Sequence, residues 1–291
     1  MSRLFVTLQY LLPHHLLCRL MYMLTRLRLR PVKDALIGVF CRLYRPDMSD
    51  ALEPDPRRYE SFNAFFTRAL RPDARPPDPD LTRVLSPCDG TLSIADTLSD
   101  GRLLQAKGHW YTDQSLLAAP PEAGVPWRDG RYATIYLAPY NYHRLHMPLS
   151  GRLTMAWHVP GRVFSVNART VARVPRLFSR NERVVCLFEG EQGPFVLVLV
   201  GALFVGSIST VWHGDITPWR GPKRSASDPP GIHQLRLASG VDTWLARGAE
   251  FARFNMGSTV VMLLPSTLAT WDAALAPGMA LVVGRALGTL T

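Results

Sequence analysis

The sequence of 291 residues contains few cysteines, and their spacing is informative. There are four of them, Cys18, Cys41, Cys88 and Cys186, without any C-x-x-C pair. Scattered cysteines of this kind do not match a zinc-binding pattern. They favour a reduced, cytosol-facing compartment, although disulfide pairing among the four stays open at this point.

The N-terminal segment lacks an apolar run long enough to cross a bilayer. Its longest stretch without a charged residue is 4–18, which has 15 residues and is interrupted by Pro13, His14 and His15. A membrane-spanning helix needs about 20 apolar residues, and the segment has no clear small-residue cleavage site of a signal peptide. We therefore expect neither a spanning helix nor a cleaved leader here.

Acidic residues are nearly absent from residues 1–45, which hold seven Arg and one Lys against one Asp. This segment therefore carries a charge of +7 out of the +10 of the whole chain. Arginines interleaved with leucines are typical of helices that lie in the headgroup region of an anionic membrane. Packing on the protein's own core is the alternative. No nucleic-acid-binding pattern accompanies the charge, so we expect no nucleic-acid partner. We expect instead a peripheral protein on the cytoplasmic face of the cell membrane.

The composition changes twice along the chain. Residues 1–70 are expected to form a helical, membrane-associating region, in which Ser61 is a candidate N-cap. Residues 71–83 contain four prolines and predict an extended linker. Residues 84–291 hold short apolar runs such as RYATIYLAP and FVLVLVGALFVGSI, which indicate strands. We predict an α+β fold with a mainly β catalytic core, barrel- or sandwich-like, and a long loop at 214–231 whose role the sequence does not show.

Three polar groups stand out in this core: Asp89 in SPCDG, His143 and His146 in YNYHRLHMP, and Gly257–Ser258 in FNMGSTVVMLL. A serine hydroxyl becomes a good nucleophile when a base, usually histidine, takes its proton, and a carboxylate can orient that histidine. The two histidines are spaced H-x-x-H, but no Glu or Cys ligand lies nearby, so no metal is expected. The Gly-Ser pair also fits a simple turn or β-bulge.

These residues belong to a series of motifs that resembles phosphatidylserine decarboxylase of the bacterial, membrane-associated type. The motifs cover nearly the whole chain in this order: SFNAFFTRALRP, LQAKGHWY, YLAPYNYHRLHMP, VPGRVFSVN, LFSRNERVVCLFE, LVGALFVGSISTVW and MGSTV. The family most often has L-G-S-T where this chain has Met256 before Gly257, a volume-conserving change. Cys88 stands where the family has a small residue, often Ala. Neither departure puts a catalytic residue in doubt.

The resemblance implies a self-processing carboxy-lyase. Asp89, His146 and Ser258 match the family's processing triad, and His143 matches its second histidine. Autocatalytic serinolysis of the Gly257–Ser258 bond would give a large chain, 1–257, and a small chain, 258–291, which remain associated. Ser258 would become a covalent pyruvoyl group, the cofactor with which the enzyme forms a Schiff base. The reaction would convert phosphatidylserine of an anionic membrane to phosphatidylethanolamine.

Several assignments stay open from the sequence. His143 is our candidate proton donor in the decarboxylation, because imidazole titrates near neutral pH, and a substrate contact is its alternative. Ser165 and Asn167 in VPGRVFSVN are candidate substrate contacts, which a strand and a turn would explain equally well. A Ser-His-Asp hydrolase of lipids or peptides, without self-cleavage, is the alternative function, although no G-x-S-x-G elbow is present. Acyl-chain preference and formation of a homodimer are not encoded in any pattern we recognise.

Overall fold

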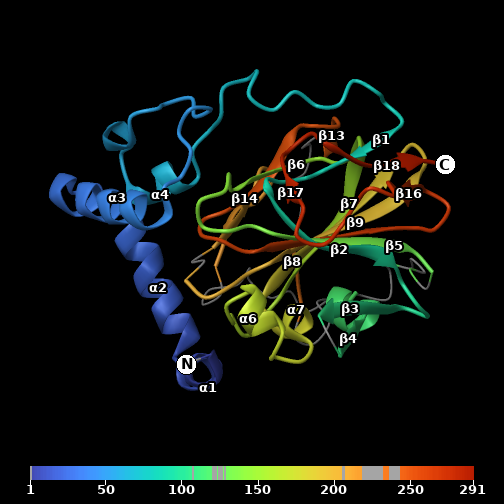
Figure 1. The fold of residues 1–291 in the computed structure, drawn as a ribbon, viewed down its shortest axis with the longest axis horizontal. Helices are drawn as coiled ribbons and strands as arrows, with labels where there is room; N and C mark the ends of the chain where they lie inside the picture. Colours follow the sequence, from blue (N-terminus) through green and yellow to red (C-terminus); the bar gives the residue numbers. More distant parts are fainter. Residues whose placement is uncertain are drawn as a thin grey trace.

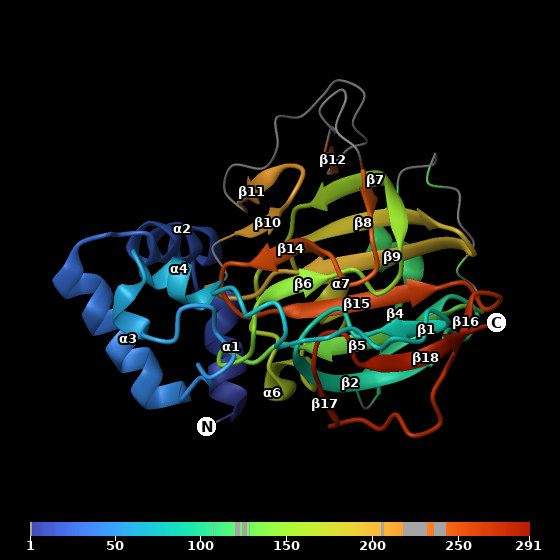
Figure 2. The same cartoon turned by 90° about the horizontal axis from the view of Figure 1, so that it is seen from above.

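The computed structural model describes residues 2–106, 108–119, 123, 127, 129–204, 207–217, 232–235 and 243–291. A group of N-terminal helices stands beside a body built mainly of strands (Figure 1; Figure 2). The predicted α+β class is therefore confirmed. Of the predicted loop at 214–231, residues 218–231 lie outside the described residues.

The N-terminal helices are short and are separated by helix-breaking residues. They are α1 (Ser2–Leu11), α2 (His14–Thr25), α3 (Arg30–Tyr44), the 3₁₀ helix η1 (Pro56–Arg58) and α4 (Phe62–Phe66). Pro13 separates α1 from α2, because proline cannot continue a helix interior without loss of a hydrogen bond. Ser61 caps α4 as predicted, since its Oγ accepts the N–H of Ala64 at 3.1 Å. No helix in the described part of the chain has both the length and the apolar character to cross a membrane.

Aromatic side chains join α3 to α4. The ring of Phe40 lies edge-on to the rings of Phe62, Phe65 and Phe66, with centroid distances between 5.4 and 5.8 Å. Edge-to-face packing is the favoured geometry for such rings. Met256 of the β body packs against this cluster. The helices therefore contact the body directly beside the Gly-Ser pair.

The largest sheet has nine antiparallel strands. Their order is β12-β7-β8-β9-β15-β5-β2-β17, and β13 also pairs with β7. The bounds are β2 (Gly90–Thr97), β5 (Arg131–Tyr136), β7 (Gly151–Val159), β8 (Arg183–Gly190), β9 (Gly193–Val200), β12 (His233–Gln234), β13 (Trp244–Leu245), β15 (Thr259–Leu264) and β17 (Ala280–Leu281). Strand β15 is buried along its whole length, and its side chains alternate between two hydrophobic cores.

The prediction of a barrel was wrong for the described strands. The sheet ends at β12 and at β17, which do not pair with each other. Each of these edge strands has only two residues. A closed barrel would require these two edges to pair with each other.

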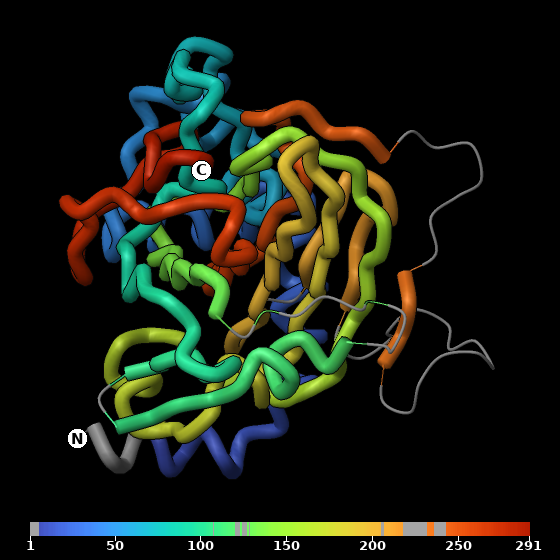
Figure 3. The backbone as a smooth tube through the Cα atoms, turned by 90° about the vertical axis from the view of Figure 1, so that its right-hand side faces the viewer, coloured from blue at the N-terminus to red at the C-terminus, as the bar shows by residue number. Residues whose placement is uncertain are grey.

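Smaller elements surround the main sheet. A four-stranded sheet has the order β11-β10-β14-β6, a three-stranded sheet has the order β1-β18-β16, and β3 pairs with β4. Their bounds are β1 (Arg83–Leu85), β3 (Arg102–Ala106), β4 (His109–Thr112), β6 (Arg144–His146), β10 (Ile208–Thr210), β11 (Gly214–Ile216), β14 (Glu250–Phe254), β16 (Ala269–Trp271) and β18 (Ala286–Leu290), with short helices α5 (Asp113–Leu117), α6 (Ala168–Val171) and α7 (Leu177–Arg180). Strands β17 and β18 pair with β2 and β1, so the end of the chain returns to the start of the β body (Figure 3).

Candidate active site

The Gly257–Ser258 pair lies in the short connection between β14 and β15. Ser258 is fully buried, and its carbonyl accepts the N–H of Leu137 at 2.9 Å. Its Oγ makes no hydrogen bond to any described residue. A buried hydroxyl without a partner is costly, and such groups are concentrated at functional sites. A strand position alone does not account for this serine.

Gly257 is packed closely on the side that a Cβ would occupy. A Cβ there would lie 3.2 Å from the carbonyl oxygen of Leu137 and 3.5 Å from Nε2 of His143. The absence of a side chain at Gly257 therefore allows the Leu137 carbonyl to approach closely, and Nε2 of His143 lies at contact distance on the same side.

His143 presents a free lone pair at this point. Its Nδ1 lies 2.8 Å from the carbonyl oxygen of Asn141, and since a carbonyl only accepts, Nδ1 carries the proton. Its Nε2 has no partner among the described residues, and the ring of Phe66 lies tilted against the imidazole, with 4.1 Å between the ring centroids. Burial, helped by the charge of Arg68, lowers the pKa of His143 to about 3. The ring is thus neutral, and Nε2 is an acceptor beside Gly257.

His146 ends strand β6 and uses both ring nitrogens. Nδ1 donates to the carbonyl oxygen of Gly248 at 2.7 Å, and Nε2 accepts from the hydroxyl of Tyr142 at 3.0 Å. Burial lowers the pKa of His146, while the charges of Glu250 and Asp89 act in the opposite direction. The acceptor nitrogen of His146, Nε2, is therefore hydrogen-bonded to Tyr142 rather than to Ser258.

Asp89 is buried and ionically paired. Arg75 donates to its two carboxylate oxygens at 3.2 and 2.9 Å, and the N–H of Val283 donates to Oδ1 at 2.8 Å. These bonds, with a further one to Asp50, raise the pKa of Arg75. The backbone N–H of His146 binds the carbonyl of Pro87, which brings the Asp89 segment next to β6.

The structure thus brings together only part of the expected set. Ser258 is buried, and Nε2 of His143 lies beside the glycine that precedes it. Asp89 and His146 instead form hydrogen bonds with other residues. The direct hydrogen-bonded chain from Asp89 through His146 to Ser258 is not formed by these residues. Sequence reasoning missed Arg75 because it lies in the proline-rich segment that predicts a linker.

A cavity of about 410 Å³ is lined by Gly257, the residue before the buried Ser258. Ser165 and Asn167 both line it, together with Tyr44, Met256 and Gly257. Asn167 also has a structural role, because its Oδ1 accepts the N–H of Thr170 and caps α6, while its Nδ2 donates to Ser165 Oγ at 2.8 Å. Both residues can therefore face a substrate, and both predictions remain untested.

A second cavity, of about 590 Å³, lies between α2 and α3. Its lining is almost wholly apolar, and it shares Phe40, Tyr44 and Met256 with the first cavity. Of the residues that line it, Val39 and Leu43 are more than half exposed. An exposed apolar lining is typical of a site that binds an apolar partner.

No group of three or more His, Cys, Asp and Glu side chains in the described ranges is arranged to hold a metal ion. All four cysteines are free thiols, and three of them are buried.

Comparisons with known proteins match nearly the whole chain. A family model described as Phosphatidylserine decarboxylase matches residues 62–289, and a second, described as PSD, matches residues 4–45. The phosphatidylserine decarboxylase proenzyme of Pseudomonas putida strain F1 is 47% identical over 286 residues, which are 98% of this chain and 97% of the relative. That of Pseudomonas fluorescens is 48% identical over 289 residues, 99% of this chain and 97% of the relative. That of Stutzerimonas stutzeri is 46% identical over 287 residues, 99% of this chain and 94% of the relative.

Proposed function

The chain belongs to the phosphatidylserine decarboxylase family, and we propose that it decarboxylates phosphatidylserine with a pyruvoyl group made from its own Ser258. One observation carries the proposal. A buried serine hydroxyl without a partner follows a glycine, and an unprotonated imidazole nitrogen lies beside that glycine. These residues fit a group built from the serine itself, because such a group needs no separate binding pocket.

The cleavage is chemistry of the backbone. Ser258 Oγ attacks the carbonyl carbon of Gly257 and loses its proton to a base, so the amide becomes an ester and the nitrogen of residue 258 becomes an amine. Elimination across Cα–Cβ of residue 258 then releases the carboxylate of Gly257. Water then replaces the nitrogen of the dehydroalanine at position 258. The nitrogen leaves as ammonia, and a ketone remains at this position.

We assign the cleavage base to His146, supported by Asp89. The negative charge of Asp89 favours a protonated His146 even without a direct hydrogen bond. Nε2 of His146 accepts a hydrogen bond from the Tyr142 hydroxyl, so this bond must break before His146 can act as the base. His143 lies nearer to the bond, so comparing the two histidine variants is the decisive test of this assignment.

We assign the later proton transfer to His143. The pyruvoyl group supplies the electron sink for loss of carbon dioxide. To donate a proton, His143 must first be protonated. Its lowered pKa keeps the ring neutral in the protein without substrate. A substrate carboxylate beside the ring would raise that pKa, since an opposite charge favours the imidazolium. The ring would thus become an acid only when substrate is present.

The two neighbouring cavities, which share three lining residues, suit a phospholipid. The cavity at Gly257 offers the polar groups of Ser165 and Asn167 to a headgroup, and the apolar cavity between α2 and α3 suits acyl chains. Arginines and exposed leucines on these helices would hold the protein on the cytoplasmic face of an anionic membrane. Free cysteines are consistent with that compartment.

The two products of cleavage should stay together. Strand β15 lies between β5 and β9, and β17 and β18 pair with β2 and β1. Every one of these partner strands belongs to the large chain. The sheet would therefore hold the small chain after the bond is cut.

Intact mass measurement of the purified protein tests the proposal. We expect two chains, 1–257 and 258–291, with a carbonyl at position 258 that hydroxylamine traps. The Ser258→Ala variant should remain one chain. A wild-type protein that stays whole, with a free Ser258, would favour the Ser-His-Asp hydrolase instead.

A further inference from the structure

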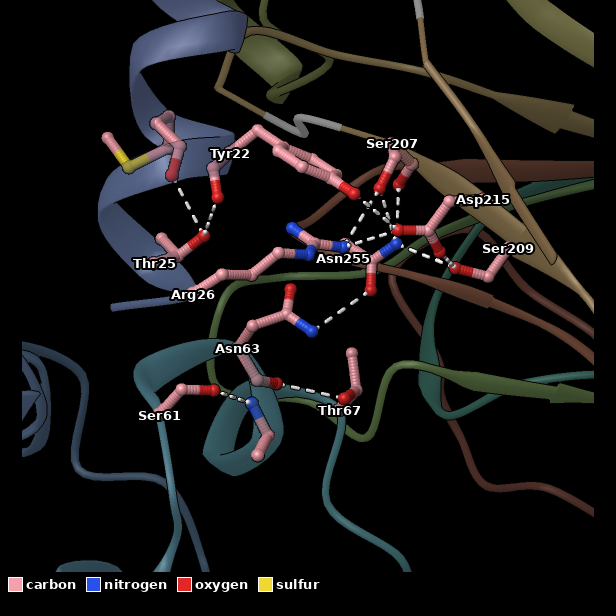
Figure 4. A network of polar contacts seen from close by, with 12 residues as sticks. Tyr22, Thr25, Arg26, Ser61, Asn63, Thr67, Ser207, Ser209, Asp215 and Asn255 are labelled. Atoms are coloured by element: carbon pink, nitrogen blue, oxygen red, sulfur yellow. Dashed lines mark hydrogen bonds and ion pairs between the residues drawn. The ribbon is translucent and has the colours of Figure 1, made fainter. Parts of the chain in front are cut away.

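A polar network links helix α2 to the residue that precedes the Met256–Gly257–Ser258 segment (Figure 4). At its centre is Asn255, which is buried. Its Nδ2 lies 2.6 Å from Ser207 Oγ and 2.8 Å from Ser209 Oγ, and its backbone N–H donates to the Ser207 carbonyl at 3.1 Å. Its Oδ1 accepts from Asn63 at 3.3 Å. The side chain is therefore fixed from several directions.

The network continues from the serines to α2. Ser209 Oγ donates to Asp215, and Arg26 donates to the same carboxylate at 2.9 Å and to Ser207 Oγ at 3.2 Å. Tyr22 adds a hydrogen bond to Asp215 at 3.0 Å. Burial would raise the pKa of Asp215, but the bonds from Ser209 and the charge of Arg26 lower it, so the carboxylate stays charged. Arg26 thus faces the protein, although the sequence pattern grouped it with headgroup-facing arginines.

The segment that this network holds is a short connection in which Met256 packs against neighbouring apolar side chains. Strand β14 ends at Phe254 and β15 begins at Thr259. Downstream, the Ser258 carbonyl is held by Leu137, and upstream, Asn255 is held by the network. Gly257 has no side chain that could fix its own position. Misplacing a reacting group by about 1 Å can cost about a hundredfold in rate.

We propose that helix α2 positions the scissile bond through two hydrogen-bonded routes from Arg26 to Asn255, one through Asp215 and Ser209 and one through Ser207. Self-cleavage then requires α2 to be seated on the β body. This inference rests on the proposed self-cleavage, and it assigns Asn255, Asp215 and Arg26 as positioning residues rather than catalytic ones. The segment expected to contact the membrane would thereby also control maturation.

The test is the time course of self-cleavage of full-length chains made by pulse-labelled cell-free translation. Arg26→Met and Asn255→Ala should each slow cleavage by about tenfold or more. The double variant Arg26→Met/Asn255→Ala should be no slower than the slower of these two single variants, because both residues act through one network of contacts. Arg58→Met is the matched control, since it removes an exposed arginine from an ion pair with Glu53. It should cleave at the wild-type rate.

A milder substitution distinguishes a direct effect on cleavage from a loss of folding. Ser209→Ala removes only the hydroxyl between Asp215 and Asn255, and it should slow cleavage while its thermal midpoint stays close to that of an Arg58→Met protein. Cleavage of Arg26→Met and Ser209→Ala within twofold of the wild-type rate would overturn the inference and leave the proposed function intact. Failure of the wild-type chain to cleave would instead overturn the proposed function together with this inference.

Discussion

Nε2 of His143 lies 3.5 Å from the position that a Cβ on Gly257 would take. That distance is an ordinary contact, but a second neighbour of residue 257 is closer. Gly257→Ala would place its methyl 3.2 Å from the Leu137 carbonyl oxygen, so the backbone of residue 257 or of Leu137 must shift. We expect cleavage about tenfold slower or worse, since the reacting atoms would move apart.

The matched control for that substitution is Gly38→Ala in α3, where a Cβ would meet no atom within 4 Å. Because alanine favours a helix, we expect unchanged cleavage and a slightly higher thermal midpoint. Equal cleavage rates for the two variants, followed by intact mass over time, would show that the close approach at residue 257 does not matter.

Substitutions of the two histidines should affect different steps of the reaction. His146→Ala should leave an uncut chain, because it removes the base assigned to serine activation. His143→Ala should still be cut but should release little carbon dioxide from phosphatidylserine vesicles, with kcat falling more than KM changes. The measurements are intact mass and carbon dioxide release. The reverse pattern would assign the cleavage base to His143, whose Nε2 is the nearer nitrogen.

Tyr142→Phe should not slow self-cleavage. The hydroxyl of Tyr142 donates to His146 Nε2 at 3.0 Å, so its removal frees the proposed base. Tyr140→Phe, which changes a half-exposed tyrosine in the same loop, serves as the control. Cleavage about tenfold slower in Tyr142→Phe alone would mean that the tyrosine itself takes part in proton transfer.

Acid should destabilise the folded chain through His143. Its pKa is about 3 in the folded protein against 6.5 for the free side chain, so the unfolded chain binds more protons between these values. Stability is then full above pH 6.5 and is lost as the pH falls toward 3, at most at about 1.4 kcal/mol per pH unit. Urea unfolding of uncut Ser258→Ala from pH 7.5 to 4.5 measures this slope.

Adding His143→Gln to Ser258→Ala should make that slope shallower, because the buried imidazole is gone. Adding His15→Gln, which removes an exposed histidine, should leave it unchanged. If the three proteins lose stability in parallel, burial of His143 does not govern the acid response.

A charge in the apolar cavity should weaken membrane binding. Leu43 is 72% exposed and lines the cavity between α2 and α3, so Leu43→Glu would place a carboxylate where acyl chains are expected. We expect binding to phosphatidylserine vesicles to fall by about tenfold or more, since burying an unpaired charge is costly. Leu81→Glu, at a leucine that is 78% exposed outside this cavity, is the control for sedimentation with vesicles. Equal loss in both variants would contradict a specific role for the cavity.

Much of this protein follows from local patterns in the sequence. Interleaved arginines and leucines predict the N-terminal helices, Ser61 predicts the cap of α4, and short apolar runs predict the strands. The Gly-Ser pair and the H-x-x-H spacing identify a candidate site because each depends on residues close together in the chain. Neighbouring residues set these features, so no long-range information is needed.

The tertiary structure decided which partners these groups have. Asp89 binds Arg75 and the backbone of Val283, and His146 binds Tyr142 and Gly248, contacts set by how the strands lie against one another. Arg26 reaches a carboxylate 189 residues away because α2 docks on the edge of β10 and β11. Pairing of this kind depends on strand register and helix docking, which arise from the packing of the whole chain. The motifs therefore predict candidate reactive groups, and only the fold determines which of them meet.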